Sequence, residues 1–378
     1  PPMTRHHFRR YRDTYGINPR ILEGLLEEFR HQAVDQSRAL GLFDEGRVSL
    51  THPACENFVA GDATVLASRF NSPPGTMQID RETGELTERL ADPDATYYPV
   101  RDEFGEVTKE RVYGTKFGIL HARLPHPGEQ VIVDVFHITT GGNAEAVSVE
   151  RAVQRLQGIT TGLTGIVYDM ALRGVNREHL YDLGLHTITK VPQLPKGRMR
   201  QRSIGRVEAR LAGASSEGVD LWAINGAPHI PVVIGGKTNY VALKRLRTHR
   251  RRNKRKTVRP YRWYNEYQIP DDPRVQPRLR LANVTVRLDD PSFSSATISR
   301  ADSLHAIAPG EDDWERLFDL RNPTESVNSW VKSRLHGPRS RAPAVGAPRQ
   351  LFALLAAALY NNFQATVAHA DRRGRLAA

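Results

Sequence analysis

The sequence is poor in cysteine, with Cys55 alone among 378 residues. A single cysteine excludes an internal disulfide and any cysteine-rich zinc site. Long apolar runs are missing as well, because the longest candidate, Leu351 to Tyr360, is well short of the roughly 18–20 residues of a membrane span. The sequence contains no secretory signal either. These absences favour a cytoplasmic protein without a membrane partner, in which Leu351 to Tyr360 forms a buried amphipathic helix.

Acidic residues are scarce in one segment of an otherwise balanced chain. The formal net charge is +12, yet residues 190–262 hold 19 of the 54 Lys and Arg residues and only 3 of the 42 Asp and Glu residues. Within this segment the run Lys244 to Arg259 has ten basic residues and no acidic one. Charges of one sign repel at this density, so a polyanion is the expected partner; a localisation signal or a disordered loop is the alternative.

The residues of this run that we expect to contact a nucleic acid share a basic side chain. They are Lys244, Arg245, Arg247, Arg250, Arg251, Arg252, Lys254, Arg255 and Lys256. Trp263 follows the run directly, and an aromatic ring beside basic residues suits stacking on an unpaired base.

The order of the elements predicts an α/β fold interrupted by a β-rich insertion. Asn18 and Pro19 indicate the start of a helix over residues 18–41, and strands are expected at 57–67, 112–122, 130–140, 164–169 and 185–189. Helices at 144–157 and 175–183 separate the last strands, which is an α/β order. We therefore divide the chain into a helical cover (1–56), a first part of the core (57–190), a basic β-rich insertion (191–310) and a second part of the core (311–378). The chain opens at Pro1 without an initiator methionine, so we expect the cover to be truncated.

Two aspartates lie in or after strands that are otherwise apolar. Asp62 interrupts the strand Phe58 to Leu66, and Asp169 ends the run that begins at Gly165. An unpaired carboxylate is costly to bury, which predicts a cation beside each one. A strand-end turn or an Arg partner is the alternative for Asp62, and a helix N-cap is the alternative for Asp169.

A third carboxylate, Glu325, lies among residues at helical spacing. Phe318, Arg321 and Lys332 occur at offsets of −7, −4 and +7 from Glu325, which fall within roughly 60° of one helix face. This pattern suits a metal ligand flanked by two phosphate-binding cations. The competing interpretation is a capping box from Asn322 to Glu325 with Pro323 at the first position, which would leave Arg321 outside the helix.

Taken together, these residues resemble the DDE transposases of bacterial insertion sequences, in the branch with a β-rich insertion before the glutamate. That branch carries Tyr, two residues, Arg, three residues, Glu, six residues and Lys; this chain has Phe318, Arg321, Glu325 and Lys332. The tyrosine is thus replaced by phenylalanine, which lacks a hydroxyl for a phosphate. The segment Tyr113 to Lys116 is similar to the Gly-x-Lys strand of the family.

The resemblance implies an RNase H-like mixed sheet flanked by helices, with Asp62, Asp169 and Glu325 as ligands of two Mg²⁺ ions and Mn²⁺ as an alternative ion. It implies cleavage of transposon ends and strand transfer into target DNA by a homodimer or higher synaptic complex at the bacterial nucleoid. Two other functions stay open: an inactive DNA-binding descendant of such an enzyme, and a nuclease of the same fold.

Overall fold

The computed structural model describes residues 4–69, 77–79, 84–88, 92–101, 107–124, 129–191, 201–211, 213, 215–253, 260–290, 300–335 and 341–377. The chain divides into two compact units. The first contains Pro1–Leu42, Gly61–Ile159 and Asn322–Ala378, and the second contains Phe43–Ala60 and Thr160–Arg321. Both combine helices with strands, so the expected α/β class is confirmed.

A mixed six-stranded sheet is organised around strand β1 (Phe58–Ala67). The hydrogen-bonded order is β4-β5-β1-β7-β8, and β6 also pairs with β5. Strand β1 is parallel to β7, and β7 to β8, whereas β5 is antiparallel to β4 and β6. The bounds are β4 Thr96–Arg101, β5 Val107–Arg123, β6 Gln130–Ile138, β7 Gly165–Val167 and β8 His186–Ile188; β2 (Met77–Ile79) and β3 (Leu86–Glu88) form a separate hairpin.

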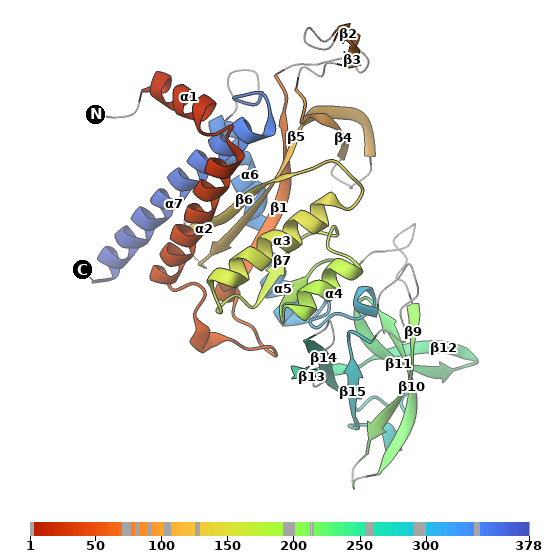
Figure 1. Cartoon of the computed structure of the whole chain (residues 1–378). Coiled ribbons are helices and arrows are strands. Elements are labelled where there is room, and N and C mark those ends of the chain that lie inside the picture. The colour runs from red at the N-terminus through yellow and green to blue at the C-terminus, as the bar shows by residue number, and fades with distance from the viewer. Residues whose placement is uncertain are drawn as a thin grey trace. The chain divides into compact units, whose positions relative to one another are not determined.

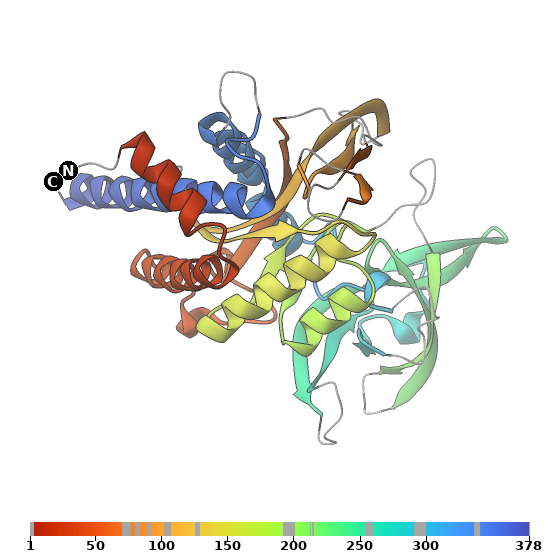
Figure 2. The ribbon, with the colours of Figure 1, turned by 45° about the horizontal axis from the view of Figure 1, so that its top comes forward.

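Helices of the first unit pack against strand β6. Helix α2 (Pro19–Ala39) starts where the sequence predicts, because the Asn18 side chain accepts the backbone N–H of Arg20 at 3.1 Å. Helices α2 and α7 (Ala347–Ala377) lie side by side in Figure 1, and α1 (Arg5–Thr14) joins them in Figure 2 as well. The remaining helices of this unit are α3 (Ala144–Ile159) and α6 (Asn322–Leu335).

Two buried polar side chains hold this arrangement together. The buried carboxylate of Asp134 in β6 pairs with Arg30 of α2 at 3.4 Å and with Arg155 of α3 at 3.1 Å. Burial nevertheless raises the pKa of Asp134, because desolvation outweighs the two guanidinium groups. The side chain of Asn362 in α7 accepts the N–H of Ile132 and donates to its carbonyl, each at 2.8 Å. Asn362 thereby satisfies backbone groups of β6 that no strand would otherwise pair.

Within the described part of the chain, one helix is long and apolar enough to cross a membrane by length and composition, and it is α7. This helix contacts β6, α2 and α6 within the first unit. A helix in the core of a folded domain meets the same criteria, so its composition alone is weak evidence for a membrane span.

The second unit contains a seven-stranded sheet in the order β12-β11-β10-β9-β15-β14-β13, in which the paired strands are antiparallel. One face packs on a core that includes Leu221, Trp263 and Val284. The strands are β9 Gln201–Arg210, β10 Ser216–Ile224, β11 Ala227–Ile234, β12 Lys237–Ala242, β13 Lys244–Arg252, β14 Tyr261–Gln268 and β15 Asn283–Arg287. The helices are α4 (Val175–Asp182) and α5 (Asp312–Phe318), with short 3₁₀ helices at Glu45–Arg47, Cys55–Asn57, Pro277–Leu279, Arg300–Asp302 and Asp319–Arg321.

Candidate functional site

Asp62 lies in β1 and is half-buried. Its Oδ1 accepts the backbone N–H of Ala63 at 2.9 Å, and its Oδ2 accepts a hydrogen bond from Nδ2 of Asn328 at 3.3 Å. Asn328 is buried in α6, within the same unit. An amide is neutral, so Asn328 fixes the orientation of this carboxylate without cancelling its charge.

Asp169 follows β7 and is half-buried. Its Oδ1 accepts the backbone N–H of Ala171 at 2.8 Å, which forms a local turn. Helix α4 begins only at Val175, and its N-cap is Gly174. The alternative interpretation of Asp169 as a helix N-cap is therefore wrong, and its carboxylate needs another explanation.

The register of the parallel pair relates the two aspartates. Ala60 of β1 is opposite Val167 of β7, and this is the last pair between the two strands. Asp62 and Asp169 each follow this pair by two residues, so the two aspartates have the same offset from the last paired position of their strands.

The expected single helix around Glu325 is wrong. Helix α5 ends at Phe318, a 3₁₀ turn covers Asp319–Arg321, and α6 begins at Asn322. The break has a clear cause, because Pro323 lacks an N–H and its ring would clash with the carbonyl of Asp319 in a continuous helix. Glu325 lies in the first turn of α6, one turn before Asn328. Its side chain falls outside the described residues.

The other members of the predicted signature have different surroundings. Phe318 stacks on Trp314, with ring centroids 4.4 Å apart, and packs against the cluster of Phe58, Ala60 and Val167. Packing therefore accounts for this aromatic ring. Arg321 is half-buried, and its Nε has no hydrogen-bond partner among the residues that the structure describes. Lys332 is half-buried in α6.

The chemistry of these acidic residues suits a hard divalent cation. Carboxylate oxygens are the ligands that Mg²⁺ prefers, and the Asp62 carboxylate accepts hydrogen bonds from the backbone of Ala63 and from the neutral amide of Asn328. Over the described side chains, no group of three or more His, Cys, Asp and Glu residues is gathered closely enough to hold a metal ion. Glu325 does not belong to that set, so the predicted trio is untested.

The basic run forms strand β13, at one edge of the seven-stranded sheet. Its arginines have different environments. Arg247 and Arg251 are exposed on the face that carries Tyr264, whose ring lies 5.1 Å from the Arg251 guanidinium and stacks with His249 at 5.5 Å. Arg251 is also directly opposite Arg262 of β14. Two like charges at a cross-strand position are destabilising, so this face suits an anionic partner.

Two of the predicted DNA contacts are wrong. The side chain of Arg245 is 5% exposed, and it forms ion pairs with Glu311 and with Asp313, the latter at 3.1 Å. Trp263 is fully buried, and its Nε1 donates to the carbonyl of Tyr181 at 2.7 Å, so the ring is unavailable to a base. Alternation along β14 turns Trp263 toward the core and Tyr264 away from it.

The rest of the basic run is divided between described and undescribed residues. Lys244 and Arg252 are exposed. Arg250 is exposed too, but its Nη1 donates to the carbonyl of Gly184 at 2.7 Å and its guanidinium lies 4.5 Å from the Tyr261 ring. Lys254, Arg255 and Lys256 lie outside the described residues. Sequence reasoning missed Arg262, although the two-residue alternation of β14 could have placed it beside Tyr264.

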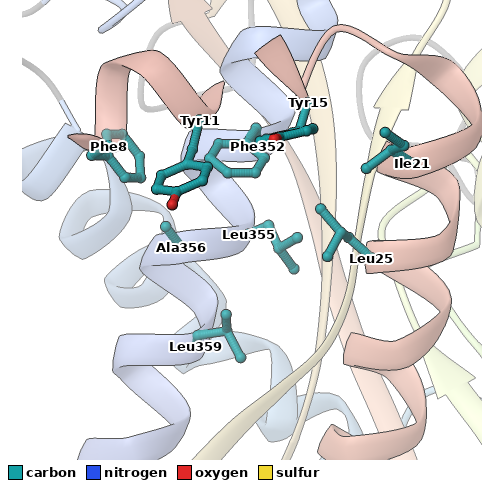
Figure 3. A pocket seen from close by; sticks show the side chains of 9 residues that line it. All are labelled: Phe8, Tyr11, Tyr15, Ile21, Leu25, Phe352, Leu355, Ala356 and Leu359. Atoms are coloured by element: carbon teal, nitrogen blue, oxygen red, sulfur yellow. The ribbon is translucent and has the colours of Figure 1, made fainter. Parts of the chain in front are cut away.

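The first unit also has an apolar pocket of about 650 Å³ between α1, α2 and α7 (Figure 3). Its walls bear no carboxylate, histidine or basic side chain; they are Phe8, Tyr11, Tyr15, Ile21, Leu25, Phe352, Leu355, Ala356 and Leu359. A catalytic pocket needs convergent polar groups, so this pocket is not the site of the chemistry discussed above.

Asn328 is the other residue that sequence reasoning missed, although its position one helical turn after Glu325 was a usable signal. Comparison of the sequence with protein-family models and with curated proteins finds no match.

Proposed function

We propose that this chain is a DNA transposase of the DDE type, built on an RNase H-like core. With β2, β3 and β4 intervening between the first two strands, the chain runs through three strands, a helix, a strand, a second helix and a last strand as β1, β5, β6, α3, β7, α4 and β8. That succession is the one expected of the RNase H-like fold, and the seven-stranded sheet comes between β8 and the helix that carries Glu325.

One observation carries the proposal: the β1–β7 register gives Asp62 and Asp169 equivalent positions two residues past the Ala60 and Val167 pair. A second supports it, because Asn328 brings α6 to Asp62, one turn from Glu325. The proposal groups these three carboxylates, which are far apart in sequence, as the ligands of one site. Two metal ions about 3.5–4 Å apart require such shared ligands.

Each group of residues would have a separate role in the reaction. When bound, two Mg²⁺ or Mn²⁺ ions would activate the attacking oxygen and stabilise the leaving oxygen. Asp62, Asp169 and Glu325 would hold them, while Asn328 keeps the Asp62 carboxylate oriented. Arg321 and Lys332 would contact phosphates of the scissile strand. Arg247, Arg251 and Arg262 would hold the backbone of transposon-end or target DNA, and a dimer or larger complex would pair two ends.

The decisive experiment compares wild type with Asp62→Ala, Asp169→Ala and Glu325→Ala in Mg²⁺-dependent cleavage and strand transfer. Each substitution should abolish both reactions and leave DNA affinity nearly unchanged. The matched control is Glu315→Ala, which removes an exposed carboxylate of α5. Cleavage without strand transfer in wild type would indicate a nuclease, and DNA binding without cleavage would indicate an inactive descendant. Full activity of Asp169→Ala would remove that residue from the site.

A further inference from the structure

Arg177 of α4 is 1% exposed, and within the described chain it forms no ion pair with a carboxylate. Its Nη1 donates to the carbonyl of Ala301 at 2.8 Å and contacts Nε2 of His305. Its Nη2 donates to the carbonyl of Leu172 at 3.5 Å and to Oγ1 of Thr189. Burial lowers the pKa of this guanidinium. A buried cation without a carboxylate is costly, so its neutral acceptors must be held in place around it.

Three separate segments meet at this side chain. Leu172 lies three residues after Asp169, and Thr189 is the residue after β8, where the chain departs toward the seven-stranded sheet. Ala301 and His305 lie where the chain returns from that sheet toward α5. One guanidinium therefore ties the residues that follow Asp169 to both connections of the insertion.

A second contact fastens the same segment. Oδ1 of Asp302 accepts the backbone N–H of Gly174 at 2.7 Å. Gly174 has φ of 51°, a left-handed conformation that favours glycine, and it is the residue from which α4 begins. On the other side of Asp169, the N–H of Tyr168 donates to the carbonyl of Ile188 at 3.1 Å. Asp169 thus lies in a short segment that is held at both ends.

We infer that Arg177 and Asp302 are positioning residues that hold Asp169 where it can bind a metal ion, and that they make this ligand depend on the base of the insertion. The inference rests on the proposed function, in which Asp169 is a ligand. Metal ligands must be placed to within about 0.5 Å, and loss of residues that orient a ligand lowers metal affinity by about 10- to 100-fold. Neither Arg177 nor Asp302 touches substrate or metal in this account.

The test measures Mn²⁺ binding without DNA, by electron paramagnetic resonance of the free ion during titration. Asp302→Ala should weaken binding about tenfold, and Asp302→Asn, whose amide oxygen can still accept from Gly174, should recover most of it. The matched control is Asp272→Ala, because Asp272 also accepts a backbone N–H, that of Arg274 at 2.8 Å, but within its own local turn. That control should bind Mn²⁺ as wild type does.

Arg177→Lys is a second test, because the lysine ammonium cannot reproduce the planar set of N–H donors of the guanidinium. It should also weaken Mn²⁺ binding, with affinity for DNA retained. If Asp169→Ala loses Mn²⁺ binding while Asp302→Ala and Arg177→Lys keep the wild-type affinity, the positioning role is wrong and the proposed function stands. If wild type and Asp169→Ala bind Mn²⁺ equally, Asp169 is no ligand, and this inference fails together with the place of Asp169 in the proposed site.

Discussion

The side-chain amide of Asn328 donates to Oδ2 of Asp62 at 3.3 Å, which connects strand β1 to the second turn of α6. The two residues are 266 positions apart in sequence. Glu325 precedes Asn328 by one helical turn of α6. A substitution at Asn328 should therefore change the orientation of Asp62, one proposed ligand, through the helix that carries Glu325, another proposed ligand.

Asn328→Ala should lower the rate of Mg²⁺-dependent cleavage by about tenfold and raise the Mg²⁺ concentration needed for half-maximal rate, because Asp62 loses the hydrogen bond from the Asn328 amide. Single-turnover cleavage at several Mg²⁺ concentrations measures both effects. Ser329→Ala, at the exposed neighbouring position of α6, is the control and should match wild type. An unchanged Mg²⁺ requirement in Asn328→Ala would show that the amide does not tune Asp62.

The arginines of β13 should differ in their contribution to stability, because some are buried and others lie on the surface. Arg245→Ala removes the buried cation that Glu311 and Asp313 share, although Asp313 keeps Arg316, and should lower the free energy of unfolding by up to about 3–5 kcal/mol. Arg247→Ala removes a side chain that is 59% exposed and should cost at most about 1 kcal/mol. Urea unfolding of both variants provides the comparison. Equal losses would contradict the assignment of Arg245 as a buried anchor.

The outer face of β13 and β14 should contribute to DNA affinity through its charge. Each phosphate contact adds a slope of about −0.9 in log affinity against log salt, so Arg251→Ala with Arg262→Ala should flatten that slope by up to about 2 units. Salt titrations with duplex DNA of unrelated sequence measure this change. Arg274→Ala with Arg278→Ala removes the same charge from residues paired with Asp272 and Glu217, and should leave the slope unchanged.

Buried histidines should make the fold sensitive to acid. Burial lowers the pKa of His121 and of His186 from 6.5 to about 3. The unfolded chain takes up these protons near pH 6.5 and the folded chain does not. Stability is therefore complete above that pH and falls as the pH drops toward 3, by about 1.4 kcal/mol per pH unit for each histidine.

Urea unfolding between about pH 7.5 and pH 5 checks this dependence. Asparagine does not titrate, so His186→Asn should reduce the slope of stability against pH by about 1.4 kcal/mol per pH unit, the contribution of one histidine. His31→Asn alters an exposed residue of α2 and should preserve the wild-type slope. A slope that His186→Asn leaves intact would mean that this imidazole is protonated in the folded state.

Local signals were enough to predict much of the fold. Asn18 and Pro19 mark the start of α2 because capping and a proline at the first position act within one turn. The apolar run before Asp169 predicted β7, because a short continuous apolar run is typical of a buried strand and is visible in neighbouring residues.

The sequence alone could not predict features that depend on contacts between residues far apart along the chain. Arg245 and Arg247 have the same chemistry and each pairs with an acid, but Arg245 is buried against Glu311 and Asp313 whereas Arg247 is exposed beside Glu266. Trp263 looked like a base-stacking ring because basic residues precede it, whereas its place in the β14 alternation turns it into the core. The pattern around Glu325 fitted both a continuous and a restarted helix, and Pro323 resolved it in favour of the restart.

The position of β13 at the edge of its sheet has a consequence for the protein free of any partner. An exposed edge strand invites pairing with the edge of another molecule, and lysine or arginine side chains oppose that pairing by repulsion. The exposed Lys244, Arg247, Arg251 and Arg252 lie along this edge, of which only the backbone of Thr248 is bonded to Thr51 among the described residues. Self-association through β13 should therefore be suppressed at low ionic strength and should rise as salt screens the repulsion, which is opposite to the salt dependence expected for binding a polyanion.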